Sequence, residues 1–174
     1  MKNKTTPSFF LLFLFLSILF LSSNQVVAQE YDIYELEKEN PSVSKSTKKV
    51  NKSKNRAEFY DLYQNLHTTI YVSNNTVDKV YGEGGIKRIT LSDSNSFAFL
   101  NTDNDQFKEV KLIIVKLKSK NDLNQVLDLS NRPHFVKLKY VFLKCYFEYT
   151  DEDIQNFIKV TPNVRVFHIS ANPS

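Results

Sequence analysis

A short apolar pattern recurs along the second half of the chain. Each copy places apolar residues at the first, fourth and sixth positions of a six-residue segment, and the copies follow one another at intervals of 26 residues. They occupy residues 86–91, 112–117, 138–143 and 164–169. Apolar residues separated by single intervening residues are typical of a short strand with one buried face. The pattern therefore predicts strands near residues 89, 115, 141 and 167.

The 26-residue interval indicates how these strands are connected. It leaves room for a crossover of about a dozen residues or more, which is the connection that parallel neighbouring strands require. One such unit cannot cover its own apolar face, whereas stacked neighbours can. We therefore expect the strands to lie parallel and adjacent in chain order, as the units of a solenoid.

A further copy and a helix precede these four strands. Ile70 and Val72 take the fourth and sixth positions of the further copy, which predicts a strand near residue 70, 19 residues before the next one. From Ala57 onward the apolar residues follow helical spacing, and they are Phe59, Leu62, Tyr63 and Leu66. This helix is expected to cover the open edge of the first strand.

The connections between the strands carry signals of their own. Asp122 with Gln125, and Thr150 with Asp153, have the spacing of capping boxes, which predicts helix starts in two of the crossovers. Residues 92–111 are rich in Ser, Asn and Asp, so we expect an irregular crossover anchored by its phenylalanines. The glycines of residues 82–85 lack the lysine and the helix start of a phosphate-binding loop, and they predict a turn.

Residues 1–28 have the organisation of a signal peptide. Lys2 and Lys4 precede an apolar run at residues 9–21, and small residues at 26–28 provide a cleavage point before Gln29. A membrane anchor is the alternative, but this run is short for a span, which needs about 20 residues. The chain is therefore expected to be exported to the periplasm, the cell surface or the medium, with no membrane span after cleavage.

Residues 29–57 are expected to form a flexible charged tether, followed by a repeat domain at 58–174. An acidic stretch up to Glu39 precedes a basic one from Lys45 to Arg56, and apolar residues are few. An electrostatic arm that attaches the protein to an anionic surface is the alternative for this run. Removal of the signal leaves 21 basic and 19 acidic residues, because the chain starts with 23 and 19 and the signal contains two lysines. This balance gives no support to a nucleic-acid partner.

Residues that support catalysis in other proteins form no recognisable motif here. Cys145 is the only cysteine, which excludes an intramolecular disulfide and leaves a buried inert thiol or a link between two chains. His67, His134 and His168 have no metal-ligand spacing, and no serine or cysteine lies in a nucleophile motif. The sequence therefore predicts neither an enzyme nor a site for a metal or cofactor.

Two of the copies resemble leucine-rich repeats, whose pattern is L-x-x-L-x-L-x-x-N-x-L. Residues 66–77 and 163–172 carry apolar residues at the fourth and sixth positions of this pattern, with Asn75 and Asn172 at the asparagine position. The resemblance covers about residues 60–174 as roughly five units. It implies an α/β fold, a short leucine-rich-repeat-like solenoid with a parallel sheet on the concave side and helices or irregular crossovers on the convex side.

In such a solenoid the third, fifth and seventh positions of each copy point from the concave sheet into solvent. These positions hold aromatic and basic residues, from which we take a candidate partner-binding site: Tyr71, Arg88, Lys116, Lys118, Tyr140, Phe142, Lys144 and His168. Exposed aromatic residues beside cations suit a protein partner with an acidic patch. The alternative is that a helix or the tether covers some of these side chains.

The sequence thus favours an exported, non-enzymatic binding module that recognises a protein or a cell-envelope component through the concave sheet surface. Two alternatives stay open: a small structural or accessory α/β domain without true repeats, and an adhesin that binds a polyanion through the lysine-rich arm. Strongly salt-dependent binding would favour the adhesin. Because Ser174 follows closely after the last predicted strand, self-association or a partner is expected to cover the C-terminal edge.

Overall fold

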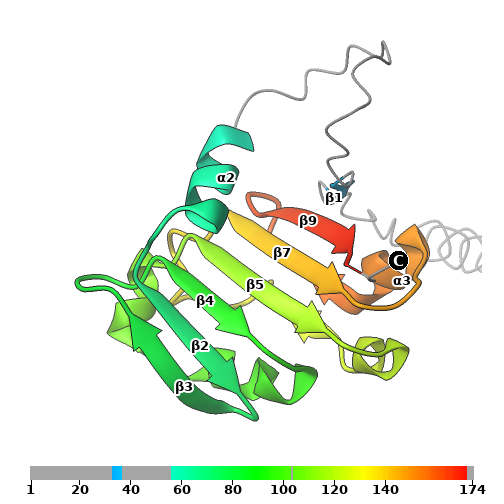
Figure 1. The fold of residues 1–174 in the computed structure, drawn as a ribbon, viewed down its shortest axis with the longest axis horizontal. Coiled ribbons are helices and arrows are strands. Elements are labelled where there is room, and N and C mark those ends of the chain that lie inside the picture. The colour runs from blue at the N-terminus through cyan, green and yellow to red at the C-terminus, as the bar shows by residue number, and fades with distance from the viewer. Residues whose placement is uncertain (1–32, 37–55, 103, 172–174) are drawn as a thin grey trace, which may run out of the picture.

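Five parallel strands form the centre of one open sheet (Figure 1). The structure is a computed structural model, and it describes residues 33–36, 56–102 and 104–171. The central strands are β2 (Thr69–Ser73), β4 (Arg88–Leu91), β5 (Leu112–Leu117), β7 (Tyr140–Cys145) and β9 (Arg165–Ser170). The edge strands β1 (Ile33–Glu35) and β3 (Thr76–Tyr81) complete the order β1-β9-β7-β5-β4-β2-β3. The five predicted strands, parallel and adjacent in chain order, are therefore confirmed.

The register of the sheet does not follow a constant interval. Ile89 pairs with Ile113, 24 residues later, and Ile113 pairs with Val141, 28 residues later. Val141 pairs with Val166, 25 residues later. A departure of two residues from the predicted interval of 26 leaves corresponding residues on the same face of the sheet. A departure of one residue, as occurs before β9, moves them to the opposite face.

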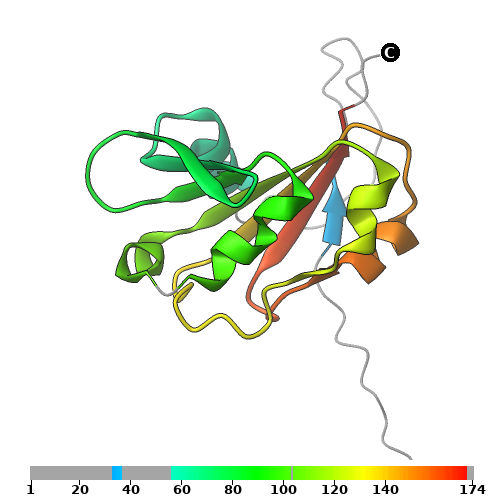
Figure 2. The same ribbon diagram turned by 90° about the horizontal axis from the view of Figure 1, so that it is seen from below.

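Apolar side chains cover both faces of the sheet. On one face, Ile89, Ile113 and Val141 pack against the crossovers, which lie together on that side (Figure 2). These crossovers contain the 3-10 helices η1 (Ser94–Asn101), η2 (Asp105–Glu109) and η3 (Lys120–Asn124) and the α-helix α3 (Asp151–Phe157). On the other face, helix α2 (Arg56–Gln64) buries Phe59 and Leu62 against β5, β7 and β9. Each large apolar side chain buried in this way contributes about 1.5–3 kcal/mol.

Helix α2 forms where the spacing of Phe59, Leu62 and Tyr63 predicts it, but it lies elsewhere than expected. It does not cover the edge of β2. It crosses β7 and β9, where the ring centroid of Phe59 lies 5.4 Å from that of Phe142 and 4.3 Å from that of Phe167. Leu66, the last residue of the predicted helical pattern, follows the end of the helix and is fully exposed.

Strand β3 occupies the edge of β2 and forms an antiparallel hairpin with it. Asn74 and Asn75 form the two-residue turn, with φ values of 47° and 63°. Positive φ at both positions is the requirement of the hairpin turns that favour asparagine. Asn75 is thus a turn residue, whereas the leucine-rich-repeat pattern places it after the strand in a repeat unit. The predicted glycine turn leads from β3 into β4, with φ values of 84° at Gly82 and 86° at Gly84.

One of the two predicted helix starts is confirmed and the other is displaced. Thr150 caps α3, its side chain accepts a hydrogen bond from the backbone amide of Asp153, and Asp153 bonds back to Thr150. In the earlier crossover the cap is Ser119, and Asp122 is the third residue of η3. The chain then forms β6 (Leu127–Asp128), which pairs with β8 (Ile158–Lys159) in a small second sheet. The crossover at residues 92–111 is irregular as predicted, with two 3-10 helices and buried Phe97 and Phe107.

Strand β1 lies in the segment for which the sequence predicts a tether. It pairs in parallel with β9, with Tyr34 opposite Phe167, and the amide of Leu36 donates to the carbonyl of His168 at 2.8 Å. The prediction that the edge of β9 needs self-association or a partner is wrong, because β1 occupies that edge. The predicted signal peptide and the tether residues other than 33–36, 56 and 57 lie outside the described residues. Of the helices in the described part of the chain, none is long and apolar enough to cross a membrane.

Candidate functional site

Most of the predicted site residues lie on the sheet face that packs against α2, hereafter the α2 face. A row across the middle of this face is formed by Tyr71, Thr90, Ile114, Phe142 and Phe167. The next row toward the strand starts contains Arg88 and Tyr140, on either side of Leu112. Lys116 and Lys144 lie in the next row toward the strand ends. The assignment of these residues to one face is therefore correct for β2, β4, β5 and β7.

Tyr140 and Phe142 are buried, in contrast to the expectation that they form an exposed aromatic surface. Each is only 2% exposed. The ring of Phe59 from α2 makes edge contacts with both, with centroid distances of 5.8 and 5.4 Å. Tyr63 makes a further edge contact with Phe142 at 4.9 Å. These two residues therefore belong to the core beneath α2, which corresponds to the alternative that a helix covers part of the predicted surface.

Arg88 binds the end of α2. Its Nη1 donates hydrogen bonds to the backbone carbonyls of Leu62 and Tyr63, both at 2.8 Å, and its Nε donates to Oγ1 of Thr69 at 3.0 Å. Carbonyl groups in the last turn of a helix lack partners within the helix, and a cation is favourable there. Arg88 is thus a structural link between β4 and α2, and its guanidinium is already occupied by these acceptors.

His168 lies on the opposite face of the sheet from the other predicted site residues. It pairs with Leu143 and not with Phe142, because the interval before β9 is one residue shorter than predicted. Its ring is buried, and Nδ1 is 2.9 Å from the hydroxyl of Tyr149. Burial lowers the pKa of His168, against the opposing effect of Glu35 and Asp151. His168 is therefore a core residue, and the prediction that it faces solvent is wrong.

Cys145 is buried on the same face as His168, in line with the interpretation of an inert thiol. Its side chain is fully covered, and burial raises the pKa of the thiol to about 12. A thiol that stays protonated is a poor nucleophile. The packing of the described residues therefore gives no role to a disulfide between two chains.

Tyr71 stays accessible at the other end of the α2 face. It is half-buried, and its ring makes an edge contact with Tyr81 at a centroid distance of 5.7 Å. The Nζ of Lys79, on β3, lies 5.0 Å from the ring centroid of Tyr71 and 5.1 Å from that of Tyr81. The two tyrosines and Lys79 thus form a small aromatic and cationic patch near the hairpin. The sequence pattern does not identify Lys79, because it does not predict β3.

Lys116 and Lys144 form the centre of the accessible part of the α2 face, hereafter the lysine pair. They are direct partners in the register of β5 and β7, and both side chains are half-buried. The Nζ of Lys144 lies 3.3 Å from the hydroxyl of Tyr63 and 5.7 Å from its ring centroid. Lys118, just after β5, is exposed. Within the described residues, neither member of the lysine pair forms an ion pair with a carboxylate.

The arrangement of the lysine pair is suited to binding an anionic group. Two like charges directly opposite on neighbouring strands repel each other, and partial burial reduces the screening that water provides. A carboxylate placed between the two ammonium groups would remove this repulsion. The ring of Tyr63 lies beside Lys144, whereas the sequence pattern predicts Tyr63 only as an apolar residue of the helix. The chemistry that this arrangement can perform is recognition of negative charge.

The chain was compared with models of protein families, with curated proteins and with solved structures, and no match was found in any of the three comparisons. Among the described residues there is no group of three or more His, Cys, Asp and Glu side chains that could hold a metal ion. The functional argument therefore rests on the geometry of the α2 face.

Proposed function

We propose that the chain is an exported, non-enzymatic binding module that recognises an acidic segment of a partner protein. The lysine pair is the centre of the binding surface. The observation that supports this proposal is the position of Lys116 and Lys144 as direct neighbours on one face, with no carboxylate partner among the described residues. A partner that supplies the missing carboxylate gains a charge-assisted contact with two cations at once.

The surroundings of the lysine pair favour a peptide over an isolated ion. Tyr63 and Tyr71 present half-buried aromatic rings on the same face, and Lys79 adds a further cation near the hairpin. Aromatic residues and cations together are typical of the residues that contribute most to protein–protein binding. An acidic segment that also carries apolar side chains would contact both kinds of group.

The finer architecture that we propose is a short, degenerate leucine-rich-repeat-like solenoid. The chain-order pairing of the five parallel strands supports it, and so does the position of the crossovers on one face. The unequal intervals and the β2–β3 hairpin are departures from a regular repeat. They favour the alternative of a small accessory α/β domain without true repeats.

An oligoglutamate peptide tests the binding surface. Its affinity for the full chain is measured at low salt for the wild type and for the double variant Lys116→Gln with Lys144→Gln. We expect the double variant to bind about tenfold more weakly or worse, because each charge-assisted contact is worth about 1.5 kcal/mol or more. The control is Lys120→Gln with Lys159→Gln, which removes the same charge from exposed positions elsewhere. It should change the affinity by less than about twofold.

Equal weakening by both double variants would contradict the proposal, because binding would then follow net charge and not the lysine pair. A sulfated polysaccharide serves as the second probe. The polyanion-binding adhesin is the better assignment if two results are found together. Replacement of the lysines at residues 45–54 abolishes binding of the polysaccharide, and replacement of the lysine pair changes the binding of neither probe.

A further inference from the structure

A second basic cluster lies at the opposite end of the sheet, where the strands begin. The backbone amide of Lys111 donates to the carbonyl of Lys87 at 2.9 Å, and the amide of Lys139 donates to the carbonyl of Lys111 at 3.0 Å. The amide of Arg165 donates to the carbonyl of Lys139 at 2.9 Å. These bonds bring four basic residues together at the starts of four neighbouring strands. Lys87, Lys111 and Lys139 directly precede the paired residues Arg88, Leu112 and Tyr140, and Arg165 pairs with Tyr140. The neighbouring positions concentrate positive charge along one edge of the domain.

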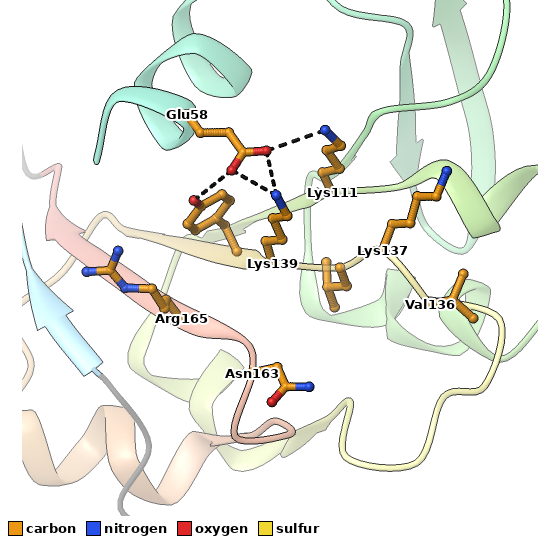
Figure 3. Close-up of a pocket in the computed structure, with 9 residues that line it drawn as sticks. Glu58, Lys111, Val136, Lys137, Lys139, Asn163 and Arg165 are labelled. Atoms are coloured by element: carbon orange, nitrogen blue, oxygen red, sulfur yellow. Dashed lines mark hydrogen bonds and ion pairs between the residues drawn. The ribbon is translucent and has the colours of Figure 1, made fainter. Parts of the chain in front are cut away.

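Helix α2 supplies a carboxylate to this cluster from its first turn (Figure 3). The carboxylate of Glu58 accepts hydrogen bonds from Nζ of Lys139 at 2.9 and 3.0 Å, and it lies 3.4 Å from Nζ of Lys111. The hydroxyl of Tyr140 donates to it at 3.3 Å. The hydrogen bond from Lys139 is the main cause of the lowered pKa of Glu58, which burial opposes. The donors of this cluster are thus arranged around a carboxylate.

A second carboxylate neutralises the outer part of the cluster. Glu109 binds Nζ of Lys87 at 2.7 Å and also binds Nζ of Lys137. These two lysines lower the pKa of Glu109 to about 2, so the carboxylate is ionised under ordinary conditions. Among the described residues, two carboxylates therefore serve four lysines, Lys87, Lys111, Lys137 and Lys139, which leaves a local excess of positive charge.

A pocket of about 690 Å³ opens between these side chains. Its lining includes three lysines, Lys111, Lys137 and Lys139, and the carboxylate of Glu58, with Arg165 beside them (Figure 3). The volume lies within the range of about 300–1,000 Å³ that is usual for small-molecule sites. Arg165 is held in place by the rings of Tyr34 and Phe167, at 4.9 and 5.3 Å from their centroids. The pocket thus combines space with more lysines than carboxylates among the described residues that line it.

We propose that this pocket binds a small anion that carries two or more carboxylate or phosphate groups. One anionic group lies between Lys111 and Lys139, and another reaches Lys137. The site is separate from the lysine pair, because it lies at the strand starts and takes a different kind of ligand. The proposal therefore does not depend on the function proposed for the lysine pair.

Glu58 acts as an internal competitor in this site. Its carboxylate occupies two of the lysines that the ligand would contact, so an incoming anion must share Lys111 and Lys139 with it or displace it. Replacement of Glu58 by glutamine removes the competing charge and keeps a side chain of similar size. The charge of this one carboxylate thus sets how strongly the pocket attracts anions.

Titration of the full chain with citrate and with pyrophosphate tests the site, with binding followed by calorimetry or by NMR. We expect saturable binding, about tenfold tighter in Glu58→Gln and about a hundredfold weaker in Lys111→Gln with Lys139→Gln, because each charge-assisted contact corresponds to about one order of magnitude and the double variant loses two. Lys116→Gln with Lys144→Gln is the matched control and should bind as the wild type does. The probe that binds more tightly identifies carboxylate or phosphate as the preferred group.

Lys137→Gln keeps the test decisive if the double variant does not fold, because the ion-pair partner of Lys137 is Glu109 of η2 and not a residue of α2. It should weaken binding about threefold or more. The proposal is overturned if neither probe binds saturably to the wild type and Glu58→Gln. It is also overturned if the lysine variants of the pocket bind as tightly as the wild type.

Discussion

The guanidinium of Arg88 joins helix α2 to the sheet through two hydrogen bonds, to the carbonyls of Leu62 and Tyr63, and it makes a third hydrogen bond to Thr69 of β2. Replacement by methionine keeps the aliphatic stem but leaves two helix-end carbonyls and a hydroxyl without this donor. We expect a loss of about 1.5–3 kcal/mol in the free energy of unfolding, measured by chemical denaturation. Arg88→Lys is the control, and it should recover part of the loss. A change below about 0.5 kcal/mol in Arg88→Met would contradict the structural role.

His168 predicts a specific dependence of stability on pH. Burial lowers its pKa in the folded state below the ordinary value of 6.5, so the unfolded chain binds the proton more readily. The contribution of the neutral ring is complete well above pH 6.5 and is lost as the pH falls through 6.5 toward the folded-state pKa. We expect the free energy of unfolding to fall between about pH 7.5 and 5.5, and His168→Gln to reduce that slope.

The carboxylates of Glu58 and Glu109 respond in a different pH window. Their pKa values are lowered from 4.5, so their contributions are present above that pH and are lost as the pH falls below it. A change in the free energy of unfolding between about pH 7.5 and 5.5 is therefore due to histidine and not to these ion pairs. An equal slope in the wild type and His168→Gln would contradict the assignment to His168.

At the scale of secondary structure, strand β1 is the element whose removal has the clearest consequence. It pairs with the edge of β9, and Leu36 is buried in the cluster beneath α2. A chain that begins at Asn51 lacks both features. We expect this shortened chain to self-associate, because an unpaired edge strand offers free backbone donors and acceptors to a second copy. Size-exclusion chromatography with light scattering checks this, and a stable monomer of the shortened chain would contradict it.

The positions of the strands could be predicted from the sequence. The sheet face on which each side chain lies, and the elements that bury it, could be predicted only in part. Alternating apolar residues such as Ile89 and Leu91 identify a strand, because alternation depends on local geometry alone. The face of Phe167 and His168 depends on a shift of one residue in the preceding crossover, which a period averaged over several copies does not resolve. The burial of Phe142 depends on Phe59, which lies far away in the chain. Both members of the lysine pair were predicted to lie on one face, because the interval between their strands differs from the period by an even number. Their direct pairing was not predicted, because a period of 26 places Lys118 opposite Lys144.

For the molecule as a whole, helix α2 separates two positively charged sites. Glu58, in its first turn, lies in the pocket at the strand starts, and Tyr63, near its end, contacts Lys144 of the lysine pair. The same helix buries the aromatic residues between these sites. A change in the packing of α2 would therefore alter both sites together. The helix thus links the two sites in addition to covering the apolar cluster beneath it.

The repeat character of the whole domain is tested by removal of one unit. Leu112 pairs with Tyr140 in the register, so deletion of residues 112–139 joins Lys111 to Tyr140 at corresponding positions and places β7 beside β4. In a solenoid each unit contacts only its neighbours, so we expect the shortened domain to unfold cooperatively with reduced stability. Deletion of residues 98–125 removes the same length but joins unrelated positions, and it should not fold. If neither deletion shows a cooperative transition by denaturation, the strands form one indivisible sheet, and the accessory domain without true repeats is the better description.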